Sequence, residues 1–200
     1  ARVTANWVWH HYFGRGLVTT LEDFGTQGEK PSHPELLDHL ATRFVNGGWS
    51  QKQIIRAIVL SRAYRMSSAH NAVAMSKDPE NRLLWRMHRR RADFETMRDS
   101  ILVISGQLEP KLGGQPFDLV ANFNTPRRTI YAMIDRQNLP AVFRTFDFAN
   151  PDYHVARRNE TTTPQQALWM MNHPFTRQQA DKLAEKIATA GSDEDKVRQL

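Results

Sequence analysis

The chain has 200 residues, 40% of them hydrophobic and 24% charged, a composition that is typical of globular proteins and argues against disorder over the whole length. It has no cysteine, which excludes disulfides, zinc–thiolate sites, a cysteine nucleophile and covalent haem attachment within these residues, and it has no apolar run long enough to cross a bilayer. The formal net charge of +6 is compatible with an acidic partner such as nucleic acid or an anionic polysaccharide, and equally with a basic scaffold whose arginines bind its own carboxylates and carbonyls.

The first predicted helix covers residues 1–13, where large apolar side chains fall near one side. Gly14 is expected to end this helix, because glycine tolerates the left-handed conformation that closes a helix. The glycine-rich stretch 17–30 then predicts an ordered loop.

A helical hairpin is predicted next. Ser32 and Glu35 have the spacing of a capping box, and Ser50 and Gln53 repeat that signal after the break at 46–48. Apolar residues recur at helical spacing after each start, so the two helices are expected to pack antiparallel across a short connection.

The remaining elements alternate between helices and irregular chain. A cap at Asp78 followed by Pro79 predicts a helix through residue 87, and Gly106 is expected to end a longer helix over 94–104. The later segments are predicted in chain order as a loop over 107–127, a short strand or extended segment over 127–135, a helix over 139–146, an irregular segment over 147–159, a capped helix over 163–171 and a last helix over 175–190.

These elements predict a mainly α fold, an irregular multi-helix domain with long ordered loops and at most one short extended segment or hairpin. We expect residues 1–200 to form a single helical domain, and 107–127 is the place where it would subdivide. Neither end carries a cap or a signal-peptide pattern, which is expected for a fragment of a longer chain.

Six strings of the sequence are informative together: NWVWHHYFGRGLV, EDFGTQGEKPSHPELLDHLATRFV, GWSQKQIIRAIVLSRAYRMSS, DPENRLLWRMHRRR, MRDSIL and RRNETTTPQQALWMMNHPF. They resemble an uncharacterised domain family abundant in planctomycetes, and the resemblance covers nearly the whole chain. Domains of that family lie in the C-terminal part of large exported proteins, which also carry a second uncharacterised domain and often a cytochrome c-like module. The resemblance therefore implies a periplasmic or extracellular location, other domains of the parent protein as partners, and haem elsewhere on the parent chain, with no cofactor in this segment.

A cluster of aromatic and histidine side chains closes the first helix: Trp7, Trp9, His10, His11, Tyr12 and Phe13. Two indole rings beside histidines are able to stack on a sugar or to lie near a redox partner. The alternative is that the rings belong to the core and that the histidines favour the helix end, where positive charge is stabilised.

Two carboxylates, Glu95 and Asp99, are predicted to lie four residues apart on one helical face beside Arg98, just after the basic run 88–91. Paired carboxylates can divide acid and base roles when their pKa values differ. The same spacing also suits a structural network of ion pairs, so both interpretations stay open.

Many polar side chains crowd the segment from Arg127 to Gln166, which has little predicted regular structure. Such a segment is either functional or tied down internally by a buried network. Asp147 is its weak candidate for catalysis, and the candidate binding residues are Arg128, Asp147, Asp152, Arg158, Thr162 and Gln165.

Three hypotheses for function follow. The leading one is a noncatalytic scaffold or binding module of an exported, cytochrome-associated protein, with polysaccharide as the candidate ligand. The first alternative is a hydrolase or oxidoreductase domain that uses segment 127–166. The second is nucleic-acid binding through the basic run 88–91. Nucleic acid is the partner that the sequence favours least. No histidine spacing such as HExxH occurs, so no metal site is predicted.

Overall fold

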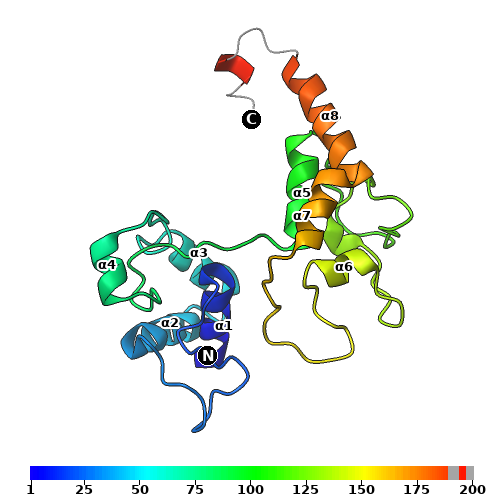
Figure 1. Cartoon of the computed structure of the whole chain (residues 1–200). Coiled ribbons are helices and arrows are strands. Elements are labelled where there is room, and N and C mark those ends of the chain that lie inside the picture. The colour runs from blue at the N-terminus through cyan, green and yellow to red at the C-terminus, as the bar shows by residue number, and fades with distance from the viewer. Residues whose placement is uncertain (189–193, 197–200) are drawn as a thin grey trace. The chain divides into compact units, whose positions relative to one another are not determined.

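The computed structural model of the chain, drawn in Figure 1, describes residues 1–188 and 194–196. The chain divides into two compact units, unit 1 (Ala1–Arg90) and unit 2 (Arg91–Leu200), and each is described by itself. In the described ranges the regular structure is helical, and β pairing is limited to one isolated bridge between Phe117 and Ala132. The predicted mainly α fold is confirmed.

The boundary between the units lies at Arg90, ahead of the 107–127 loop at which a subdivision was expected. Whether the two units unfold together as one domain stays a prediction. Within the described residues, no helix is both long and apolar enough to span a membrane.

Unit 1 is built around helix α1, which packs against α2 and α3. Trp9 and Phe13 stack in its core with ring centroids 4.0 Å apart. Gly14, with φ of 78°, ends α1 as predicted. The helices of this unit are α1 (Arg2–Phe13), α2 (Pro34–Asn46), α3 (Gln51–Val59) and α4 (Ala72–Lys77).

A buried asparagine fastens the loop after α1 to that helix. The Asn6 amide donates to the carbonyl of Val18 and accepts from its N–H, both at 2.9 Å. A Cβ at Gly16 would lie 2.3 Å from the Val18 carbonyl oxygen, so this close approach of the chain requires glycine. The loop after α1 is therefore an ordered part of unit 1, as its sequence predicted.

Unit 2 has an aromatic core in which Phe94 contacts the rings of Phe143, Phe146 and Trp169. Much of the chain around this core is irregular, as the sequence predicted for 107–127 and 147–159. Its regular elements are α5 (Phe94–Ile104), the 3-10 helix η1 (Thr129–Tyr131), α6 (Ala141–Thr145), α7 (Pro164–Asn172) and α8 (Pro174–Ala188). The capping box of Thr163 and Gln166 is present at the start of α7.

The prediction of a helix that begins at Asp78 is wrong. Helix α4 ends just before Asp78, and the Asp78 carboxylate accepts from the N–H groups of Arg82 (2.9 Å) and Leu83 (2.7 Å). Asn81 has a φ of 54°, and its amide donates to the carbonyl of Arg86 at 2.8 Å. These side-chain bonds replace the helical ladder with turns, because Asp and Asn compete well for nearby backbone groups.

One finer prediction, the cap at Ser32, is also wrong. Ser32 does not cap α2, because its hydroxyl lies 3.0 Å from Nδ1 of His33, and His33 itself precedes the helix. Segment 127–135, predicted as a short strand or extended segment, begins with the 3-10 turn η1, where two hydrogen bonds to Asp99 hold Thr129, and continues with the extended Ala132, which forms the single bridge. The predicted last helix reaches residue 190, and positions 189 and 190 lie outside the described residues.

Candidate functional sites

Asp147 is the centre of the polar segment in unit 2. It follows α6 with a positive φ of 60°, and its side chain is 12% exposed. Its carboxylate accepts from Arg91 Nη2 at 2.7 Å, from the N–H of Thr161 at 2.9 Å and from the Thr161 hydroxyl at 2.8 Å. Burial raises the pKa of Asp147, but the hydrogen bonds from Thr161 and the bond and charge of Arg91 outweigh it and hold the pKa below its usual value.

Arg91 and Gln166 extend this network. Arg91 also donates to the carbonyl of Thr161 and to the side-chain oxygen of Gln166. Gln166 is buried, and its amide donates to the carbonyl of Thr145 at 2.8 Å. The start of α7 is thereby fastened to the end of α6, so these polar groups hold irregular chain in place.

The two carboxylates predicted to share a helical face have different basic partners. Both oxygens of Glu95 accept from Arg158 at 2.9 Å, and the Arg158 guanidinium lies 4.4 Å from the ring centroid of Phe148. Asp99 accepts from the N–H and the hydroxyl of Thr129 at 2.7 and 2.6 Å, and it pairs with Arg128 at 3.5 Å. Each carboxylate thus links α5 to a separate stretch of irregular chain.

The remaining candidates lie at the surface. Asp152 pairs with Arg136 at 3.6 Å, and both side chains are at least half exposed. Thr162 and Gln165 are exposed. The structure thus places the predicted binding residues in several local contacts, and a ligand for them stays a prediction.

The basic run 88–91 is used mostly inside its own units. Arg90 donates to the carbonyl of His11 at 2.6 Å in unit 1, and Arg91 belongs to the Asp147 network of unit 2. Arg89 is exposed. Two of the three arginines are therefore engaged by the chain itself, which weakens the hypothesis of a nucleic-acid surface here.

An open groove of about 530 Å³ lies along α1 and α3 of unit 1. Trp7, 40% exposed, contributes an indole ring to it, and Tyr12 a phenol ring. The groove is lined by Val3, Thr4, Trp7, Val8, His11, Tyr12, Gln51 and Ile55. In Figure 1 the two helices that form it lie in the blue and cyan part of the chain.

Helical geometry separates the aromatic and histidine side chains of residues 7–13 into two groups. Consecutive residues of a helix differ by about 100° around its axis, so Trp7 and Trp9 point to opposite sides. Trp9 and Phe13 are in the core, whereas Trp7, His11 and Tyr12 line the groove. The spacing of four residues from Trp7 to His11 is the signal by which the exposed stripe was identifiable.

In the parts of the chain that the structure describes, no group of three or more His, Asp or Glu side chains is placed to hold a metal ion.

The fold and these sites define a helical protein with an open aromatic groove in its first unit and a polar network in its second. The chain belongs to the PSD1 family, described as "Protein of unknown function (DUF1553)", whose profile matches residues 1–200. Comparison with curated proteins and comparison with solved structures each gave no match. The resemblance to an uncharacterised domain family is confirmed.

Proposed function

We propose that this chain is a noncatalytic binding module and that the groove along α1 and α3 binds a polysaccharide. The observation that carries the proposal is an open groove of about 530 Å³ whose lining includes the exposed Trp7 ring and the Tyr12 ring. That volume lies in the range of about 300–1,000 Å³ that small-molecule sites occupy, and an open groove accommodates a chain that continues at both ends.

The lining of the groove combines apolar rings with hydrogen-bonding groups. A sugar ring has apolar faces of C–H groups and an edge of hydroxyls, so it needs both kinds of contact. Trp7 and Tyr12 supply flat rings, and Thr4, His11 and Gln51 supply donors and acceptors. The lining includes no Asp, Glu, Lys or Arg, which favours an uncharged sugar and binding that salt weakens little.

The contacts in unit 2 support a structural role for its polar segment. A general acid must carry a proton near neutral pH, whereas the pKa of Asp147 lies below its usual value and its oxygens already accept hydrogen bonds from Arg91 and Thr161. Glu95 is occupied by Arg158, and Asp99 by Thr129. These pairings favour a scaffold over a hydrolase or oxidoreductase.

The biological setting of the module is proposed from the family resemblance alone. It comprises export to the periplasm or the extracellular space, and a parent protein with a cytochrome c-like module. In that setting the groove would hold a polysaccharide outside the cytoplasm, and the partners of the chain would include other domains of the parent.

The proposal is tested by calorimetry and affinity electrophoresis with the 200-residue chain and soluble polysaccharides, both neutral and acidic. We expect saturable binding of a neutral glycan, and a loss of about tenfold in affinity for Trp7→Ala, because one aromatic contact is worth about 1 kcal/mol. Trp49→Ala is the matched control, since Trp49 is 58% exposed and does not line the groove.

A blank panel would overturn the proposal, and so would equal losses in the Trp7 and Trp49 variants. Binding of amphipathic peptides in place of glycans would reassign the groove to a protein partner. Circular dichroism of each variant separates lost binding from lost folding.

A further inference from the structure

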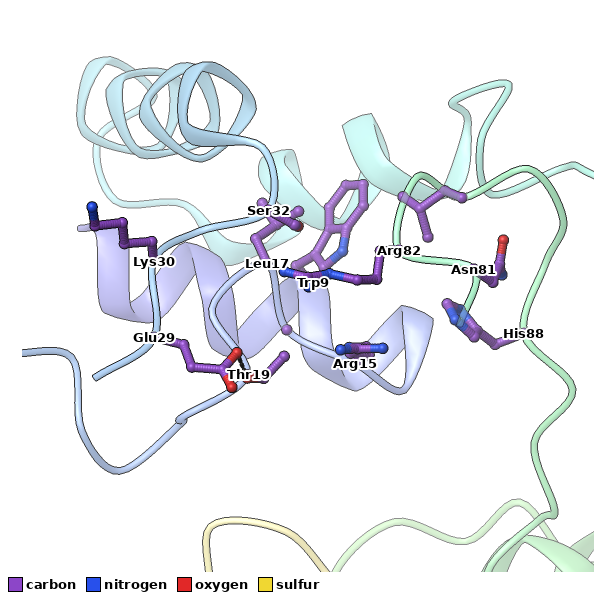
Figure 2. A pocket seen from close by; sticks show the side chains of 12 residues that line it. Trp9, Arg15, Leu17, Thr19, Glu29, Lys30, Ser32, Asn81, Arg82 and His88 are labelled. Atoms are coloured by element: carbon purple, nitrogen blue, oxygen red, sulfur yellow. Dashed lines mark hydrogen bonds between the residues drawn. The ribbon is translucent and has the colours of Figure 1, made fainter. Parts of the chain in front are cut away.

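Unit 1 contains a second pocket, shown in Figure 2, which differs from the groove in size and charge. It lies between the end of α1, the loop that follows it, the chain leading into α2 and the turn after α4. It is lined by Trp9, Arg15, Gly16, Leu17, Thr19, Glu29, Lys30, Ser32, Asn81, Arg82, Leu84 and His88. The pocket is partly open to solvent, and its volume of about 20 Å³ is enough for about one water-sized group.

The walls of this pocket are fixed by hydrogen bonds, so it is present without a ligand. The Asn6 side chain is hydrogen-bonded to the backbone of Val18, and the N–H of Ser32 donates to the carbonyl of Leu17 at 2.8 Å. On the opposite wall, the buried Asn81 side chain accepts from the N–H of Arg86 at 3.2 Å and donates to its carbonyl at 2.8 Å. A preformed site loses little conformational entropy when it binds a ligand.

Positive charge predominates around the space. The Arg82 side chain extends toward Trp9, whereas Lys30 points away from the other labelled side chains (Figure 2). Arg15 lines the pocket, and its pairing with Glu80 is loose, at 3.5 Å, with Glu80 largely exposed. Glu29, the only acidic residue of the lining, accepts a hydrogen bond from the Thr19 hydroxyl.

His88 is an unsatisfied group in the pocket wall. Both of its ring nitrogens are buried and have no hydrogen-bond partner in the chain. Burial lowers the pKa of His88, and the charges of Arg15, Arg86 and Arg90 lower it further, against a smaller opposing effect of Asp78. An anion placed here would accept a hydrogen bond from the imidazole and would offset the repulsion among these cations.

We propose that this pocket binds one sulfate or phosphate group, held by Arg15, Arg82 and His88. A tetrahedral oxyanion offers several acceptor oxygens, and the planar guanidinium of arginine matches them with paired donors. The small volume admits one oxygen of the anion and excludes a sugar ring or a nucleobase, which would stay outside the pocket with the rest of the anion at its mouth. The site is separate from the polysaccharide groove, and the two share no lining residue.

The test uses the 200-residue chain with sodium sulfate, inorganic phosphate, glucose 6-sulfate and glucose 6-phosphate, at an ionic strength kept constant with sodium chloride. NMR signals of the histidine rings report the binding. We expect saturable shifts of the His88 signals, with a Kd of about 1 mM or lower. We also expect the pKa of the His88 ring to rise on binding, because the bound anion stabilises the charged imidazolium.

Arg82→Gln is the diagnostic variant, because the Arg82 side chain is exposed and its loss leaves no buried group unpaired. It should weaken binding about tenfold, since a charged hydrogen bond is replaced by a neutral one. Arg62→Gln is the matched control, because Arg62 is exposed in the same unit but does not line the pocket. It should change the affinity by less than about twofold.

If inorganic sulfate or phosphate binds as tightly as the sugar esters, the pocket is a site for the free ion. If the sugar esters bind more tightly, the pocket recognises a group carried on a larger molecule. Shifts that sodium chloride alone reproduces would overturn the proposal, and so would equal affinities in the Arg82 and Arg62 variants. The shifts of the His88 signals and the pKa of its ring are both measured without a glycan, so they test this pocket independently of the groove.

Discussion

Each of the two units of this chain is stabilised internally in a different way. Unit 1 packs three helices around stacked aromatic and aliphatic side chains, and its charged groups are largely left at the surface. Unit 2 has long irregular segments between its helices, and buried or half-buried charged side chains attach these segments to α5 and α7. Polar residues crowd unit 2 because irregular backbone needs partners, whereas the open groove and the cationic pocket are found in unit 1.

Arg98 is the clearest example of this difference. Its side chain in α5 is fully buried, and it donates to the carbonyls of Phe123, Thr125 and Arg127 and to the Thr129 hydroxyl. Burial lowers the pKa of Arg98 to about 10, partly offset by the charge of Asp99, so the guanidinium stays charged at neutral pH. One side chain therefore satisfies the backbone of the loop that precedes η1.

Replacing Arg98 should have the largest effect on stability. Arg98→Met leaves three partly buried carbonyls without their donor, so we expect the free energy of unfolding to fall by about 3 kcal/mol or more. Urea unfolding followed by circular dichroism measures this change. Arg128→Met is the control, because Arg128 is 52% exposed and its pair with Asp99 should contribute less than about 1 kcal/mol.

Hydrogen exchange of the Arg98 variant also tests the prediction of a single domain. If residues 1–200 unfold cooperatively, amides of α1 and α5 should lose protection together. Loss confined to unit 2 would show two domains, and equal stability of the Arg98 and Arg128 variants would contradict the structural role of Arg98.

Regular apolar periodicity made the long helices predictable. The prediction failed where side chains compete with the backbone for hydrogen bonds. Helices α1 and α5 were identified by apolar spacing and by glycine at the end. The chain after Asp78 has similar signals, but Asp78 and Asn81 bond the backbone locally and form turns. Helix α4 was missed altogether, because its six residues bury no side chain and carry no apolar stripe.

The site residues were identifiable by type, but their partners were not. Arg91 and Asp147 are 56 residues apart, and Glu95 and Arg158 are 63 apart. Composition shows that such groups exist, but only the fold shows which cation meets which carboxylate. The cationic pocket was not predicted either, because Arg15 and Arg82 are distant in the sequence and only the fold of unit 1 brings them together.

Asp147→Asn should have an intermediate effect. Asparagine keeps the shape and tolerates the positive φ, so the change isolates the charge that Arg91 and Thr161 bind. We expect a loss of about 1–3 kcal/mol at pH 7, measured by urea unfolding. Asp152→Asn is the control, because Asp152 is half exposed and its contact with Arg136 is long, at 3.6 Å.

The pH dependence gives the same variant a second readout. A carboxyl whose folded pKa is lowered stabilises the fold above its usual value of 3.8 and loses that contribution as the pH falls through the folded pKa. The Asp147 variant should therefore lose less stability than the wild type on acidification. An unchanged acid limb would mean that Asp147 is not held in the charged form by the network.

The smallest effect concerns His173, the counterpart in unit 2 of His88 in unit 1. Its ring stacks on Trp169 with centroids 4.4 Å apart, its Nδ1 accepts from the N–H of Phe175 at 3.2 Å, and burial lowers its pKa below 6.5. The fold therefore favours the neutral ring, so this contribution to stability is complete above about pH 6.5 and is lost as the pH falls through the folded pKa. His173→Asn keeps an acceptor for Phe175 but does not titrate, so its stability should change less between about pH 7.5 and 5.5 than that of the wild type. Sulfate should leave the pKa of His173 unchanged while raising that of His88; an equal rise in both would mean that the anion acts through general charge screening and not through the pocket of unit 1.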